Sequence, residues 1–236
     1  MNDQIGADIK IFTKNYPTRT TTPPLDVITV YFCLEFKKHV MTLSKFTTQY
    51  NSKNTIILLE GKRNVLELDK EKLIQLGNLL ATHLPLATFR SGNAVGADFY
   101  FSQGVLQVAP ERLQVITPFD NHREKQNNAY ETISLDKIDL ANESEVVYQS
   151  KNNKKTKSLI DKYVGGAKDR FAIKAAYIIR DTVKVTGTNS GIPPTTFAFF
   201  YDDLDNPKTG GTGHTMSICD INNVPYLTQN EWLNWL

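Results

Sequence analysis

Short, continuous apolar runs alternate with helix-forming segments from residue 55 onward, and this alternation limits the chain to a few folds. A run such as TIILLE is typical of a strand that is buried on both faces of a sheet. The segments between the runs carry apolar side chains at helical spacing, as Leu73, Leu76 and Leu80 do. Strands are predicted in this way at residues 55–60, 87–90, 113–119 and 195–201, with a last short one at 224–227.

Helices are predicted between these strands, at residues 70–84, 99–108 and 170–185. Asp69 and Asp169 stand where helix N-caps are expected, and Pro85 and Pro110 follow the ends of the first two helices. Alternating strands and helices imply a parallel sheet. We therefore expect an α/β fold, a Rossmann-like three-layer arrangement with a mostly parallel sheet of about five strands and helices on both faces.

The first part of the chain differs from this pattern. Residues 13–25 are rich in Thr and Pro, which is typical of an extended arm or loop. Residues 26–36 are β-prone, which fits either an extra strand or a docking segment. We therefore predict an N-terminal arm or extension over residues 1–54 and a single Rossmann-like domain over residues 55–236.

Composition bears on the partners of the chain. Among 236 residues, 27 are basic and 25 acidic, so a net charge of +2 supplies no overall field to attract nucleic acid or an anionic membrane. No apolar run is long enough to span a bilayer, and the first residues lack the apolar core of a signal peptide. Cys33 and Cys219 are too few for a disulfide framework or a zinc site by themselves. We expect a cytoplasmic protein without a bound metal, and we expect neither a membrane nor a nucleic acid as its partner.

Polar residues and glycines follow the predicted strands, where ligands bind in open parallel sheets. Gly61 and Arg63 follow the first strand and are candidate ligand-binding residues. A glycine-rich stretch follows the second strand, and a second such stretch follows the fourth, after Asp202 and Asp203. The sequence therefore predicts a ligand site at this edge of the sheet, although turns are polar in any protein.

The stretch TGGTGHT, at residues 209–215, lies between a predicted strand and a predicted helix. Glycines there let the backbone approach an anion closely, and free N–H groups at a helix start point toward it. A tight turn without a ligand fits the same residues. The stretch is neither a Walker phosphate loop, because no Gly-Lys-Ser/Thr ends it, nor the dinucleotide GxGxxG motif, because no acidic ribose partner follows it. The candidate ligand-binding residues here are Gly210, Gly211, Thr212, Gly213 and Thr215.

The other stretch, RSGNAVGAD, covers residues 90–98. Arg90 can pair with a phosphate or with a carboxylate. Asp98 fits two roles, either accepting a hydrogen bond from a ribose hydroxyl or stabilising the helix dipole from the first turn. The candidate ligand-binding residues of this stretch are Arg90, Ser91, Gly92 and Gly96.

The two glycine loops, in this order and with these flanking strands, resemble those of the SLOG superfamily. This Rossmann-like group includes the lonely-guy and lysine-decarboxylase-like proteins and the DNA-processing protein A fold. The resemblance covers about residues 55–230 and is closest to bacterial and phage-borne members. It implies a nucleotide-binding domain in which the second loop holds phosphate and the first lines the ribose and phosphate side, and it also implies a homodimer.

The sequence departs from the phosphoribohydrolase branch of that superfamily, which carries PGGxGTxxE. Here Thr209 replaces the Pro, His214 replaces the Thr, and Ser217 stands where the catalytic Glu belongs. These departures argue against cleavage of an N-glycosidic bond. We therefore predict binding of a nucleotide or an ADP-ribose-type ligand, for which a sensor is one role, and we expect no cofactor.

Two alternatives remain open from the sequence, and so does the question whether the chain is an enzyme. The first is a hydrolase that cleaves a nucleoside or nucleotide N-glycosidic bond. In that case Asp98, or else Asp203, would supply the carboxylate, and His214 would act as the acid. The second is DNA binding, by analogy with DNA-processing protein A, which the near-neutral charge opposes.

Overall fold

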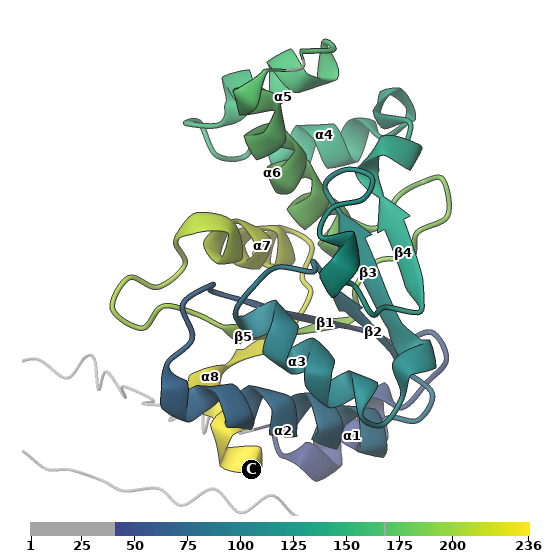
Figure 1. The fold of residues 1–236 in the computed structure, drawn as a ribbon, viewed down its shortest axis with the longest axis vertical. Helices are drawn as coiled ribbons and strands as arrows, with labels where there is room; N and C mark the ends of the chain where they lie inside the picture. The colour runs from purple at the N-terminus through teal and green to yellow at the C-terminus, as the bar shows by residue number, and fades with distance from the viewer. Residues whose placement is uncertain (1–40, 168) are drawn as a thin grey trace, which may run out of the picture. The chain divides into compact units, whose positions relative to one another are not determined.

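The computed structural model describes residues 41–167 and 169–236, so the β-prone segment at residues 26–36 and most of the predicted arm lie outside the described residues. The described part contains a six-stranded sheet in the order β4-β3-β2-β1-β5-β6, and all paired neighbours are parallel. This confirms the predicted Rossmann-like α/β fold (Figure 1). The strands are β1 (Ile56–Gly61), β2 (Thr88–Ser91), β3 (Leu113–Thr117), β4 (Glu131–Ser134), β5 (Phe197–Tyr201) and β6 (Tyr226–Thr228).

Helices cover both faces of the sheet, with α2 and α3 on one side of it and α6 and α7 on the other (Figure 1). Along β1, alternate side chains enter opposite cores, since Ile57 and Leu59 pack with the first group and Leu58 packs with α7. The helices are α1 (Leu43–Tyr50), α2 (Glu67–His83), α3 (Ala97–Leu106), α4 (Ser144–Ser150), α5 (Lys157–Val164), α6 (Arg170–Thr186), α7 (Gly210–Ile221) and α8 (Gln229–Trp232).

Helix α1 lies within the stretch that was predicted to be an arm. Its Phe46 is fully buried, and the ring centroid of Phe46 lies 4.8 Å from that of Phe197 and 5.2 Å from that of Phe199. These aromatic contacts cover one face of β5 with apolar surface. Residues 43–50 are therefore part of the packed core rather than of a peripheral arm.

Of the two predicted helix caps, one is confirmed and the other is wrong. Asp169 caps α6 as predicted, because its Oδ1 accepts hydrogen bonds from the N–H groups of Phe171 and Ala172. Helix α2 begins before Asp69, so the prediction of Asp69 as its N-cap is wrong. The carboxylate of Asp69 instead accepts a hydrogen bond of 2.7 Å from the Tyr201 hydroxyl, which ties α2 to the end of β5.

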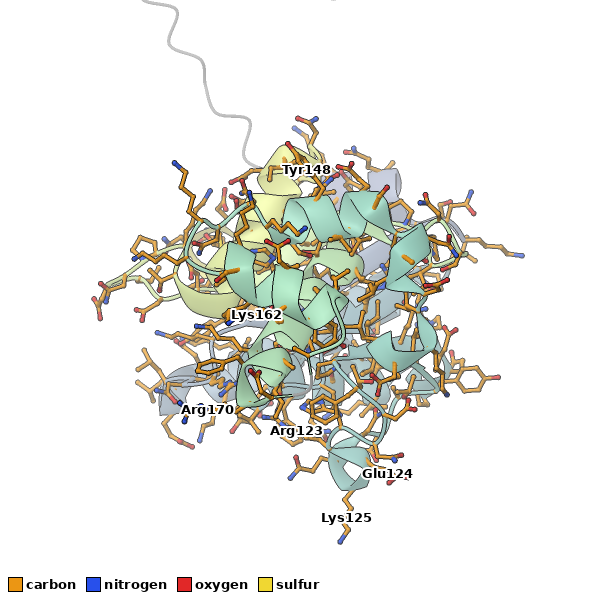
Figure 2. The ribbon with its side chains drawn as sticks, turned by 90° about the horizontal axis from the view of Figure 1, so that it is seen from above. Arg123, Glu124, Lys125, Tyr148, Lys162 and Arg170 are labelled. Carbon is orange, nitrogen blue, oxygen red and sulfur yellow. The ribbon has the colours of Figure 1, made fainter. Side chains whose placement is uncertain are left out.

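Short 3-10 helices fill several connections. Between β3 and β4, the chain passes through η2, where Lys125 projects outward in the view of Figure 2. Arg123, just before η2, has φ +53° and donates a hydrogen bond to the carbonyl of Asn93, so this connection contacts the glycine loop after β2. The 3-10 helices are η1 (Pro110–Arg112), η2 (Glu124–Gln126), η3 (Leu135–Lys137), η4 (Leu140–Asn142) and η5 (Leu233–Trp235).

Candidate functional site

The strand order reverses between β1 and β5, because the chain proceeds from β1 to β2, β3 and β4 on one side and then to β5 and β6 on the other. Ligands of open α/β sheets bind at such a reversal, beyond the carboxyl ends of the strands. A cleft of about 640 Å³ lies there. It is lined by parts of the segments 60–63, 94–98, 153–156, 174–181, 202–203 and 209–214.

The start of α7 opens onto this cleft. Among the described residues, the N–H groups of Gly210, Gly211 and Thr212 have no hydrogen-bond acceptor, and no side chain caps the helix. Gly210 has φ +64°, and a side chain placed there would meet nothing within 4 Å. The first N–H group that is bound belongs to Gly213 and donates to the Thr209 carbonyl at 2.9 Å. The helix start therefore presents unpaired donors and a positive dipole end to the cleft.

Two residues of the same stretch support the loop instead of facing the cleft. A Cβ on Gly213 would overlap with the Lys208 carbonyl, so only glycine fits there. Thr215 is fully buried, and its hydroxyl donates a hydrogen bond of 2.9 Å to Oε1 of Glu60. Of the five residues predicted to bind ligand in this stretch, Gly210, Gly211 and Thr212 line the cleft, and Gly213 and Thr215 do not.

Arg90 does not reach the cleft, contrary to its prediction as a ligand-binding residue. It is fully buried on β2, where it donates to Gln114 at 2.6 Å and to the carbonyls of Lys184 and Pro193, both at 2.9 Å. Burial lowers the pKa of Arg90 to about 10. The physical reason is the alternation of side chains along a strand, which directs this residue into the layer beneath the end of α6.

The remaining residues of the first loop pack against the protein instead of lining the cleft. A Cβ on Gly92 would overlap with the guanidinium of Arg180, and a Cβ on Gly96, which has φ +88°, would overlap with the Arg63 backbone. Ser91 is fully buried. None of Ser91, Gly92 and Gly96 lines the cleft, whereas the predicted residues Gly61 and Arg63 do.

Asp98 lines the cleft, but both oxygens of its carboxylate already accept hydrogen bonds from the backbone. Oδ1 accepts a hydrogen bond from the Gly61 N–H at 3.2 Å, and Oδ2 accepts from Gly92 at 3.2 Å and Ala94 at 3.4 Å. Burial raises the pKa of Asp98, against the opposing charges of Lys184 and Arg180. This carboxylate thus joins the loops after β1 and β2, a role that was not predicted, and it does so from the first turn of α3, as the helix-dipole alternative expected.

The other two predicted catalytic residues also line the cleft. Asp203 is partly exposed, with Oδ1 lying 3.6 Å from Nζ of Lys62. Nε2 of His214 lies 3.1 Å from the Thr182 hydroxyl. Burial lowers the pKa of His214, which leaves the ring neutral near pH 7, so little of it carries the proton that a general acid donates. Asp98, Asp203 and His214 form no hydrogen bonds with one another within the described residues.

One face of α6 lines the cleft and was missed from the sequence. Lys174, Tyr177 and Asp181 project from it at helical spacing, and Arg180 lies beside them. The hydroxyl of Tyr177 lies 2.8 Å from Nε2 of His122. The spacing of 174, 177 and 181 was a usable signal, but only the apolar stripe of this helix entered the prediction.

A group of buried charges lies at the cleft, where Glu60, Arg180 and Asp181 line it and Lys184 does not. Nζ of Lys184 lies 2.6 Å from Oε2 of Glu60 and 2.9 Å from Oδ1 of Asp181, and Nη2 of Arg180 lies 2.8 Å from the same Oδ1. Burial raises the pKa of Glu60 to about 7 despite the Lys184 ammonium. Burial also raises the pKa of Asp181, but the charges of Arg180 and Lys184 outweigh it and leave that pKa below its ordinary value. Two neighbouring carboxyl groups therefore differ in their tendency to ionise.

The described residues contain neither a cluster of metal ligands nor a helix that could span a membrane. No three side chains of His, Cys, Asp or Glu in residues 41–167 and 169–236 lie close enough together to hold a metal ion. In the same part of the chain, no helix combines the length and the apolar character needed to cross a membrane.

Comparisons with known proteins give a similarity of fold. No protein-family model and no curated protein matches the chain. A solved structure of DNA processing protein A from Helicobacter pylori, described for its single-stranded DNA binding mode, is similar with 14% sequence identity and a TM-score of 0.47. The match covers 77% of this chain and 72% of that one. At this identity the similarity concerns the fold alone.

The expectation that nucleic acid is not a partner is corrected, because the net charge on which it was based does not exclude one. The expectation rested on the net charge of +2, which averages over the whole chain. That average does not say where the cations stand, and Lys62, Arg63, Lys155 and Lys174 all line one cleft, together with several acidic residues. The net charge therefore does not exclude a nucleic acid.

Proposed function

We propose that the chain binds a nucleotide or a nucleotide-derived, ADP-ribose-type ligand in the cleft between the ends of β1 and β5. The observation that carries this proposal is the start of α7, where the N–H groups of Gly210, Gly211 and Thr212 are unpaired within the described residues and open onto the cleft. Such a helix start binds a phosphate through its N–H groups and its dipole. The resemblance of the two glycine loops to the SLOG superfamily supports the same ligand class.

The size of the cleft and some of its side chains suit this ligand class. Its volume of about 640 Å³ falls within the range of small-molecule sites, which is roughly 300–1,000 Å³. Tyr177 supplies an aromatic ring, and Lys62, Arg63, Lys155 and Lys174 supply cations. The lining also contains five acidic residues, Glu60, Asp98, Asp181, Asp202 and Asp203. Cations suit phosphates, and an aromatic ring suits a base.

We favour binding over hydrolysis because the residues predicted to cleave a glycosidic bond have other hydrogen-bond partners or are in an unsuitable protonation state. Asp98 accepts three backbone hydrogen bonds, and His214 is neutral near pH 7. Asp203 remains at the margin of the cleft beside Lys62. A sensor that returns its ligand intact agrees with this arrangement.

A thermal-shift screen of the full chain tests the proposal, with mononucleotides, ADP-ribose, NAD and cyclic nucleotides as probes and chromatography of each mixture afterwards. A ligand at about 100 times its dissociation constant stabilises a protein by about 2.7 kcal/mol, so binding gives a measurable shift. We expect a shift with intact ligand. No shift with any probe would overturn the proposal, and release of free base would establish the hydrolase alternative.

Gly211→Val is the matched variant for this screen. A Cβ at position 211 meets only Oδ2 of Asp181, at 3.4 Å, so the ligand-free melting temperature should change little. The larger side chain covers the unpaired N–H groups, and the ligand-induced shift should disappear. An undiminished shift in this variant would contradict the assignment of the α7 start.

A further inference from the structure

Asp181 places one free carboxylate oxygen beside the start of α7. Its Oδ1 lies 2.8 Å from Nη2 of Arg180 and 2.9 Å from Nζ of Lys184. Its Oδ2 lies 3.4 Å from the position that a Cβ on Gly211 would take, and it receives no hydrogen bond from the described residues. The residue is only 4% exposed, and it lines the cleft.

This oxygen acts only as an acceptor. The two cations on Oδ1 keep the pKa of Asp181 low in spite of burial, so the group is ionised near pH 7. An ionised carboxylate has no proton to donate. The N–H groups of Gly211 and Thr212, in contrast, only donate. The cleft therefore presents donors and an anionic acceptor side by side.

These N–H donors and this carboxylate oxygen together require a ligand that has both an acceptor and a donor. A fully deprotonated oxyanion at the helix start suffers repulsion from Oδ2, whereas an oxyanion with an adjacent O–H group satisfies both the donors and the acceptor. Sites built to bind a hydroxyl discriminate strongly against analogues that lack it, because a buried polar group is then left unpaired. A phosphate near pH 7 retains a proton in part, since its second pKa is about 6.

We propose that Asp181 is a specificity-determining residue that selects a phosphate ligand with an O–H donor next to the helix start. This inference rests on the proposed function, because it concerns the same cleft. The O–H group has two chemical sources, the phosphate itself or a neighbouring sugar hydroxyl. Sulfate has the shape and charge of phosphate but carries no proton near pH 7, and ADP-ribose has sugar hydroxyls but no terminal phosphate.

Titration calorimetry on the full chain compares inorganic phosphate, sulfate and ADP-ribose at constant ionic strength, for the wild type and for Asp181→Asn. We expect the wild type to bind phosphate at least about tenfold more tightly than sulfate, which is the value of one charge-assisted hydrogen bond, and the variant to lose this preference. If the wild type binds both anions equally and the variant loses affinity for ADP-ribose alone, the donor is a sugar hydroxyl.

Two further variants make the result decisive. Gly211→Ala keeps every charge and places a methyl group against Oδ2, so it should reduce the ratio of phosphate to sulfate affinity even where Asp181→Asn fails to fold. Glu111→Gln removes one carboxylate from exposed η1, before β3, and should leave the ratio unchanged.

The outcomes separate this inference from the proposed function. If anions or ADP-ribose bind the wild type and neither Asp181→Asn nor Gly211→Ala alters the phosphate preference or the ADP-ribose affinity, the role of Asp181 is refuted and the binding cleft stands. If none of the probes binds the wild type and the nucleotide screen is also negative, the proposed function fails, and this inference fails with it.

Discussion

The loop between β2 and α3 and the loop between β5 and α7 look alike in sequence, but their first glycines differ in what surrounds them. In the first loop the protein itself fills the space beside the glycines, since a Cβ on Gly92 would overlap with Arg180 and a Cβ on Gly96 with Arg63. In the second loop, a Cβ on Gly210 would meet nothing within 4 Å. The first loop is therefore closed by its own protein, whereas the second is open at Gly210 and closed only at Gly213, which packs against the backbone of Lys208.

The backbone donors of the two loops differ in the same way. Asp98 accepts hydrogen bonds from the N–H groups of Gly92 and Ala94 in the first loop. The N–H groups of Gly210 and Gly211 in the second loop have no acceptor among the described residues. Glycine is therefore required in such a motif for one of two physical reasons, close packing of the protein or access for a ligand. The sequence alone does not distinguish between them.

The largest expected effect is that of Gly96→Ala in the first loop. The substitution combines a positive φ of 88° with overlap between the new Cβ and the Arg63 backbone. Backbone strain and overpacking together should lower the free energy of unfolding by about 4 kcal/mol. Urea denaturation measures this loss. A loss of less than about 1 kcal/mol would show that the first loop is as open as the second.

A smaller effect is expected for Asp98→Asn, which tests whether that side chain holds the first loop or acts on a ligand. An amide would direct its NH₂ group toward N–H donors on one side, at Gly61 or at Gly92 and Ala94. The free energy of unfolding should fall by about 2 kcal/mol, the cost of unsatisfied buried donors.

Denaturation of the ligand-free protein measures this effect. Asp161→Asn, which removes a carboxylate paired with Lys151 on the exposed side of α5, is the control for a loss of charge alone. Unchanged stability of Asp98→Asn would contradict the structural role and favour a direct role of this carboxylate at the ligand.

Much of the fold could be predicted from the sequence, because its signals are local. The apolar run at residues 55–60 is buried as β1 because it is continuous, and Asp169 caps α6 because its side chain reaches the next N–H groups. Helix α1 was not predicted, because the burial of its Phe46 depends on Phe197, which is distant in the chain. Local spacing does not contain that contact.

The candidate site was predictable only in part, for the same reason. The strand-to-helix position of Gly210 and Gly211 identified an open helix start correctly. Arg90 was assigned to a ligand because an arginine beside a glycine suits phosphate, yet its partners are carbonyls at residues 184 and 193. Asp181 was missed because its position facing Gly211 arises from the packing of α6 against α7.

The smallest effect is expected for Gly210→Ala, the counterpart of Gly96→Ala. Both glycines have positive φ, of 64° and 88°, but only Gly96 lacks room for a side chain. Gly210→Ala should therefore lower the free energy of unfolding by only about 1 kcal/mol, which is the cost of the left-handed backbone conformation. The difference between the two variants, measured by urea denaturation, isolates the packing that distinguishes the closed loop from the open one. Equal losses would mean that backbone strain alone explains both glycines, and the contrast between the loops would then rest solely on where their N–H groups bond.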